Sequence, residues 1–182
     1  MNDRTGGGAP GPRARTAGVF YLLTIVTGAY AAMSARGGVP ANLAATACYV
    51  AVTLLFYFLF KPVSRTLSLL AAFVSLVGCT VGALGAFRLA PFHVNALVFF
   101  GIYCILIGTL IFRSTFLPRV LGALMMLGGL GWLTFVSTTL AHALSPYNML
   151  PGILGEGALT LWLLAFGVNV PRWNQQAGAS AA

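Results

Sequence analysis

Six long apolar segments follow one another along the chain, separated by short stretches that hold most of the charged residues. They cover about residues 17–35, 40–60, 66–87, 94–112, 120–142 and 150–170. Each holds roughly 20 residues, and at about 1.5 Å per residue a helix of this length crosses a hydrocarbon core of about 30 Å. The runs are continuously apolar rather than alternating, which argues against a transmembrane β-barrel. The pattern therefore predicts an all-α polytopic membrane protein, a six-transmembrane-helix bundle.

The stretches outside the apolar segments are short and polar. The connections at 36–40 and 60–65 leave room only for tight turns, so consecutive helices should pack as antiparallel hairpins. Residues 1–16 are rich in glycine, proline and arginine and predict a disordered basic tail. We expect one transmembrane domain over 17–171 and a second tail over 172–182.

Composition and charge strengthen the membrane interpretation and orient the bundle. Hydrophobic residues make up 59% of the chain, charged residues 7%, and the net charge is +8. Alternating loops place eight basic residues on one side, against Arg36 and Arg88 on the other, and the excess predicts that both termini are cytoplasmic. The eight are Arg4, Arg13, Arg15, Lys61, Arg65, Arg113, Arg119 and Arg172. We expect them to contact anionic lipid headgroups rather than nucleic acid.

Two features of the segments leave alternatives open. The stretch VFYLLTIVTGAYA from Val19 to Ala31 resembles a secretory signal peptide, although the apolar run continues beyond it and we expect it to be retained. Cys48, Cys79 and Cys104 each lie within a segment, where a thiol packs as a small hydrophobe. Their spacing indicates neither a disulfide nor a metal site.

Small residues in the segments predict close helix packing. Gly78 and Gly82 form a GxxxG motif in the third segment, and Gly155 and Gly157 lie in the sixth. In lipid, small residues let helix backbones approach closely. We favour packing within the monomer over a dimer face, and the oligomeric state stays open.

One carboxylate stands out among the apolar runs. Glu156 is one of only two acidic residues in the chain and lies near the start of the sixth segment. Its helical neighbours at i−4 and i+4 are Gly152 and Thr160, so it should face the interior of the bundle. An acid inside a membrane is costly and is a candidate proton or cation relay. It could equally be structural, because it lies near the positive end of its helix dipole.

Other polar residues are expected at the same level of the membrane. Thr134, Thr138 and His142 recur every four residues in the fifth segment, so we expect a stripe that faces Glu156. His93 enters the fourth segment from the same side, and Tyr103 lies deeper in it. The candidate ligand or proton site thus comprises Glu156, His142, Thr160, Thr138, His93 and Tyr103.

Several chemistries find no support in the sequence. No lysine lies within a segment to form a Schiff base, and both histidines lie near one boundary, which disfavours a bis-histidine haem. Nucleophile, zinc-protease and phosphate-binding motifs are absent from the sequence. We therefore expect no catalytic residues, metal or cofactor.

Four stretches resemble a known family. They are AGVFYLLTIVTG from Ala17, KPVSR from Lys61, the block from Leu97 to Leu133, and GILGEGALTLWLLAFGVNVPRW from Gly152. Together they resemble the bacterial membrane family of domain of unknown function 4386, most distinctively in the turn from Arg113 to Gly122.

The resemblance implies a helical bundle in a bacterial plasma membrane. The family pattern typically has an acid at Glu156, whereas Tyr103 stands where many members have a histidine. The family has no assigned activity. We expect a non-enzymatic accessory, regulatory or ligand-sensing bundle that could bind a membrane-protein partner. The alternative is a small transporter or proton-coupled permeation unit that uses Glu156, and a lipid-acting enzyme is the third hypothesis.

Overall fold

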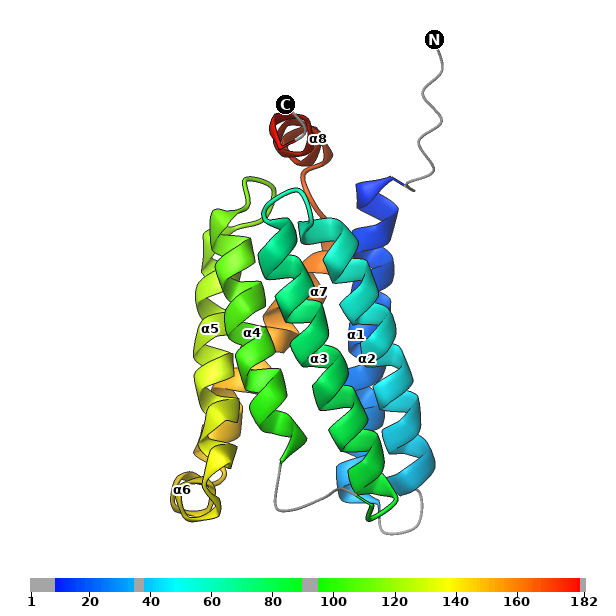
Figure 1. Cartoon of the computed structure of the whole chain (residues 1–182), viewed down its shortest axis with the longest axis vertical. Helices are drawn as coiled ribbons and strands as arrows, with labels where there is room; N and C mark the ends of the chain where they lie inside the picture. Colours follow the sequence, from blue (N-terminus) through cyan, green and yellow to red (C-terminus); the bar gives the residue numbers. More distant parts are fainter. Residues whose placement is uncertain (1–8, 35–37, 90–94, 181–182) are drawn as a thin grey trace.

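The computed structural model describes residues 9–34, 38–89 and 95–180. Long helices follow each other as antiparallel hairpins, and no β-strand occurs within these ranges (Figure 1). The main helices are α1 (Pro10–Met33), α2 (Gly38–Phe60), α3 (Arg65–Ala86), α4 (Ala96–Arg113), α5 (Arg119–Leu133) and α7 (Leu150–Ala165). Two shorter helices are present as well. Helix α6 (Thr138–Leu144) lies between α5 and α7, flanked by 3₁₀ turns at Thr134–Val136 and Tyr147–Met149, and α8 (Val170–Ala179) follows α7.

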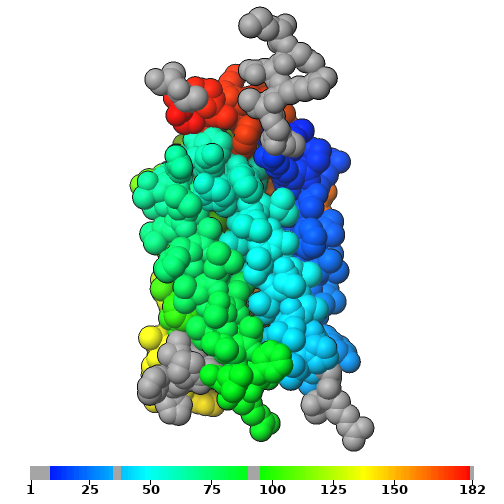
Figure 2. Space-filling view, turned by 45° about the vertical axis from the view of Figure 1, so that its right-hand side comes forward, coloured from blue at the N-terminus to red at the C-terminus, as the bar shows by residue number. Residues whose placement is uncertain are grey.

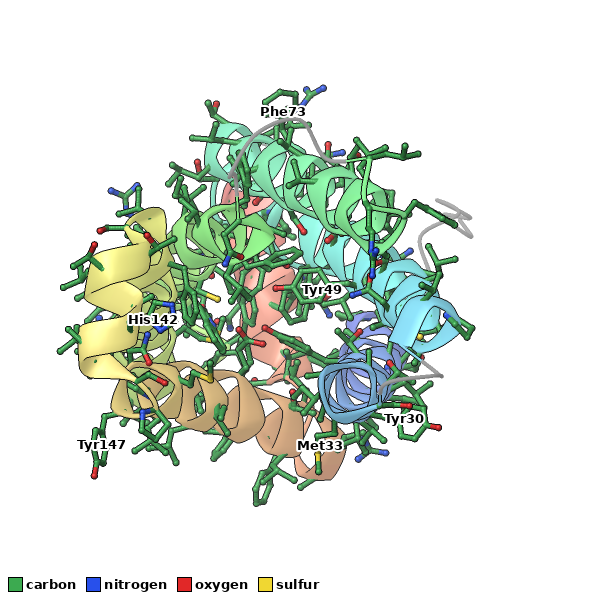
Figure 3. All side chains as sticks on the ribbon, turned by 90° about the horizontal axis from the view of Figure 1, so that it is seen from below. Tyr30, Met33, Tyr49, Phe73, His142 and Tyr147 are labelled. Carbon is green, nitrogen blue, oxygen red and sulfur yellow. The ribbon has the colours of Figure 1, made fainter. Side chains whose placement is uncertain are left out.

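The six main helices form a closed ring. Each packs against its neighbours in chain order, and α7 returns to pack against α1. Seen along the helix axes, the ring surrounds a core of side chains, and Tyr49 lies near its middle (Figure 3). The outer surface carries exposed large apolar side chains on every side, as expected where helices face lipid tails.

Five spans are long and apolar enough to cross a membrane, namely α1 to α4 and the stretch Arg119–Val136, in which the 3₁₀ turn extends α5. The sixth member of the ring, α7, has only 16 residues, and the chain bends by 104° between it and α8. The chain is therefore an all-α, multi-pass membrane protein, as the sequence predicted.

Several helix boundaries differ from the predicted ones. Helix α1 begins at Pro10, inside the predicted tail, because Ala14 and Ala17 are fully buried and extend the packed face of the first segment. The predicted tail at 172–182 is largely helical as well, because α8 runs from Val170 to Ala179. Residues 1–8 and 181–182 lie outside the described residues.

The fifth segment is not one continuous helix. It was predicted to run from 120 to 142, but α5 ends at Leu133 and Ser137 adopts an extended backbone with φ −124° and ψ 123°. The Ser137 hydroxyl then accepts a hydrogen bond from the Leu140 amide and caps α6. Hydroxyl residues that can satisfy backbone groups locally favour such a break.

The two ends of the bundle differ. The start of α1 and helix α8 lie at one end, together with the α2–α3 and α4–α5 turns (Figure 1). Seven of the predicted basic residues belong to this end, namely Arg13, Arg15, Lys61, Arg65, Arg113, Arg119 and Arg172. In the space-filling view α8 lies across it (Figure 2). We call it the arginine-rich end and the other, which carries Arg88 and α6, the opposite end.

Candidate functional site

Glu156 points into the ring and is held by side chains of two other helices, α5 and α4. Its Oε1 accepts a hydrogen bond from Trp132 Nε1 of α5 at 2.8 Å and one from Cys104 Sγ of α4 at 3.5 Å. A side chain at Gly152 would overlap the Trp132 indole, so the glycine leaves the space that the indole occupies beside α7. The lone carboxylate therefore has specific partners inside the bundle.

Three tyrosines from different helices surround the same region. Tyr21 of α1, Tyr49 of α2 and Tyr103 of α4 are all buried, and we call them the tyrosine cluster. The Tyr49 ring centroid lies 5.7 Å from that of Tyr21 and 5.7 Å from that of Tyr103, both edge-on. The packing of α7 against α1 brings Tyr21 to the side of Glu156.

The hydroxyls of the tyrosine cluster have unused hydrogen-bonding capacity. The Tyr21 and Tyr49 hydroxyls lie toward each other, Tyr21 also lies toward Glu156, and the Tyr103 hydroxyl lies toward Thr53. None of the three hydroxyls reaches normal hydrogen-bond geometry within the described residues. Thr160, one turn from Glu156 on α7, is buried and its Oγ1 also has no partner there. Buried polar groups without partners are rare in folded proteins. The cluster is thus equipped to bind something polar.

Glu156 has no charged partner in the part of the chain that the structure describes. The lysine and arginines lie at the ends of helices, and His142, on α6, is exposed. The Glu156 side chain is only partly buried although its hydrogen-bond donors lie inside the ring. A negative charge at this position would have to be balanced by something that enters the ring, or removed by a proton.

The ring is closed between the tyrosine cluster and the arginine-rich end. Phe60 and Phe116 stack there with centroids 5.9 Å apart. A layer of buried aliphatic residues fills the space between them and the cluster, namely Leu59, Ile107, Leu110, Ile111 and Leu163. Helix α8 covers this end, since Trp173 Nε1 donates to the Leu59 carbonyl at 2.8 Å and Gln176 Oε1 accepts from the Thr115 amide at 3.1 Å.

The predicted site residues separate into two groups. Tyr103 and Thr160 lie in the interior with Glu156. Thr138 and His142 lie on α6, where both are exposed, because the helix break at Ser137 turns their segment away from α5. The predicted stripe facing Glu156 is therefore wrong for these two residues. His93 lies outside the described residues.

Four residues around Glu156 were missed as site residues. Tyr49 and Thr53 are polar residues four apart in the second segment, and Thr53 contacts Ser75 at 2.6 Å and joins α2 to α3. Cys104 adjoins the predicted Tyr103. Trp132 and Tyr21 carried no signal in the sequence, because their proximity to Glu156 depends on how the ring closes.

The predicted packing glycines also divide. Gly78 and Gly82 of α3 face α4, and Gly155 lies against the α5 backbone at Leu124. A Cβ at Gly157 would have no neighbouring heavy atom within 4 Å, so the prediction that this glycine packs against another helix is wrong. Each glycine in the first group lies where two helices touch.

A tighter glycine contact joins α4 to α5. Gly101 lies against Gly129, and Gly108 against Gly122, with carbonyl oxygens 2.6 to 2.9 Å from where a Cβ would stand. On each helix the two glycines are seven residues apart, which places them on one face of that helix. This spacing was the available signal in the sequence.

The cofactor chemistry of the described residues is limited. They contain no group of three histidine, cysteine or acidic side chains positioned to hold a metal. Cys48, Cys79 and Cys104 are free thiols. The interior site is therefore defined by one carboxylate, one indole, one thiol and the hydroxyls around them.

Comparison with known proteins identifies the family over part of the chain. An uncharacterized protein of Archaeoglobus fulgidus is 30% identical over 90 residues, which are 46% of this chain and 56% of that protein. The chain thus spans little more than half the length of this relative. No solved structure matches. Residues 92–167, which include Trp132 and Glu156, match the family described as Domain of unknown function (DUF4386), the one that the sequence resembles.

Proposed function

We propose that this protein is a non-enzymatic, ligand-sensing membrane bundle that binds a small polar molecule inside its ring. One observation carries the proposal, namely that Glu156 adjoins the tyrosine cluster, whose three buried hydroxyls reach no normal hydrogen bond within the described residues. A purely structural core would be more stable with apolar groups at these positions, because an unsatisfied buried hydroxyl costs about 1–3 kcal/mol. A bound ligand would recover that free energy.

The asymmetry of the bundle supports entry from the opposite end. The Phe60–Phe116 stack and α8 close the arginine-rich end. Glu156 lies six residues from the start of α7, which is about 9 Å from the opposite end. A sensor of this kind binds its ligand from one side and transmits the occupied state through the closed half to a partner.

The distribution of charge supports an orientation with both termini in the cytoplasm of a bacterial cell, in the plasma membrane. Seven described basic residues lie at the arginine-rich end and only Arg88 at the other, and cytoplasmic loops are enriched in arginine and lysine. The same residues would meet anionic lipid headgroups. An open hollow at this end is lined by Arg15, Phe166 and Gly167 among others.

The test is native mass spectrometry of the protein released from nanodiscs, with Glu156→Gln and Tyr103→Phe as variants. We expect the wild type to retain a small molecule and both variants to lose it. The matched control is Tyr30→Phe, because the Tyr30 side chain is 59% exposed on the outside of α1 and should not affect retention (Figure 3).

The stability of the empty protein separates a ligand site from structural packing. Removing the unpartnered hydroxyl with Tyr103→Phe should stabilise the ligand-free protein by about 1 kcal/mol while it weakens ligand binding. Opposite signs for stability and binding are expected of a site that evolved to bind. If Tyr103→Phe destabilises the ligand-free protein and no variant changes what is retained, the cluster is structural and the proposal fails.

The alternative function is a small transporter, and the closed ring around a single intramembrane acid favours it over an enzyme. Transport requires that the interior also opens to the arginine-rich end. We expect that it does not. In a cysteine-free background, Thr160→Cys should react with a membrane-impermeant thiol reagent only from the opposite end. Labelling from both ends in oriented vesicles would instead favour the transporter.

A further inference from the structure

We propose that the ligand of the interior site is a small protonated amine, held by Glu156 and by the rings and hydroxyls of the tyrosine cluster. This inference rests on the proposed function, and it names the chemical class of the molecule that the site would bind. The charge, the walls and the dimensions of the site each support it.

The charge of the site calls for a cation. Glu156 is the only acidic residue in the described part of the chain, and it takes part in no ion pair there. Its Oε1 already accepts hydrogen bonds from Trp132 and Cys104. Both donors are neutral, so they orient the carboxylate without neutralising it. No donor in the described residues reaches normal hydrogen-bond geometry with its Oε2, toward which an ammonium group could donate beside the neutral Tyr21 hydroxyl.

The walls of the site are those that attract organic cations. Tyr21, Tyr49 and Tyr103 present aromatic rings around one region, and Phe100 packs against Tyr49 at a centroid distance of 4.7 Å. Cations are attracted to the faces of aromatic rings, and more strongly where water is excluded. A carboxylate flanked by aromatic rings therefore favours an alkylammonium over a neutral or anionic molecule.

The unpartnered hydroxyls complete the match. A primary ammonium carries three N–H donors, and a tyrosine hydroxyl oxygen can accept a hydrogen bond while its own hydrogen turns elsewhere. One ammonium could donate to Glu156 Oε2 and to two hydroxyls of the cluster. A quaternary ammonium has no N–H donor and would leave those hydroxyls unsatisfied. The site should therefore prefer primary over quaternary amines.

The dimensions restrict the ligand to a small one. Neighbouring rings of the cluster are already in edge-to-face contact, with centroids 5.7 Å apart. No space remains between them for a further ring. We therefore expect amines that carry a short aliphatic group rather than an aromatic one.

The experiment is calorimetric titration of the full chain in nanodiscs at pH 7, where alkylamines are protonated. The probes are ethylammonium and tetramethylammonium chlorides, the neutral isostere propane, ethanol as a hydrogen-bonding neutral control, and sodium chloride at equal ionic strength. Ethylammonium should bind the wild type more tightly than any other probe. Glu156→Gln should lower that affinity by about 30-fold or more, because the cation loses its buried charge partner. Tyr30→Phe should leave it unchanged.

Three results would overturn the inference. The first is that ethanol binds as tightly as ethylammonium, and the second is that sodium chloride alone produces the same heat as ethylammonium chloride. The third is that a folded Glu156→Gln variant binds ethylammonium with unchanged affinity. If amines do not bind while the wild type still retains another small molecule in native mass spectrometry, the choice of ligand class is wrong and the proposed function stands. If no amine binds and the wild type retains no small molecule, the ligand class and the proposed function are both wrong.

Discussion

Phe60→Ala should destabilise the folded protein by about 3–5 kcal/mol, which is typical of removing a fully buried aromatic side chain. Phe60 has no exposed surface, packs edge-on against Phe56 at 5.7 Å and stacks on Phe116 at 5.9 Å. In a membrane, the loss comes from van der Waals contacts inside the ring that lipid cannot replace. The free energy of unfolding, measured by steric trapping in bicelles, checks the expected value.

Phe73→Ala is the matched control for this substitution. The Phe73 side chain on α3 is 66% exposed and points away from the ring (Figure 3). Lipid tails should fill the space that it leaves, so we expect a change of no more than about 0.5 kcal/mol. Similar losses for Phe60 and Phe73 would show that the arginine-rich end is not tightly packed, and the one-sided entry in the proposed function would lose its support.

The order and type of the helices could be predicted from the sequence, because the bilayer sets the length of an apolar span. Short connections then impose antiparallel neighbours. The helix ends were less predictable. The early start at Pro10 depends on burial of Ala14 and Ala17 against other helices, and the break before Ser137 depends on local capping. Neither helix boundary is visible in the apolar pattern from which the segments were predicted.

The site could be predicted only in part, for a physical reason. Glu156 was identified because an acid is rare among apolar segments. Its partners are ordinary membrane residues, and a helix with apolar residues on both its lipid face and its packed face does not reveal which residues point inward. Tyr49 and Tyr57 share one helical stripe, yet only Tyr49 is buried in the ring. Closure of α7 against α1, which brings Tyr21 near Glu156, joins residues from opposite ends of the chain.

Two glycine-to-alanine substitutions should change stability in opposite directions. A Cβ at Gly129 would lie 2.6 Å from the Gly101 carbonyl oxygen, and backbone atoms cannot move aside as a flexible side chain can. We expect Gly129→Ala to cost about 1–3 kcal/mol by overpacking, beyond the gain of about 1 kcal/mol in helix propensity. Gly157→Ala meets no atom within 4 Å and should stabilise α7 by about 0.5–1 kcal/mol. Thermal unfolding of both variants in the same nanodiscs checks the two signs.

A double-mutant cycle shows whether the close contact between α4 and α5 is the cause. Once Gly129→Ala has forced the two backbones apart, Gly101→Ala meets less resistance, because both substitutions place a methyl group at the same crossing. The double variant should therefore lose clearly less stability than the sum of the single losses. Gly157→Ala combined with Gly129→Ala should instead be additive. Additive losses at Gly101 and Gly129 would contradict a shared contact and would trace the destabilisation to each helix separately.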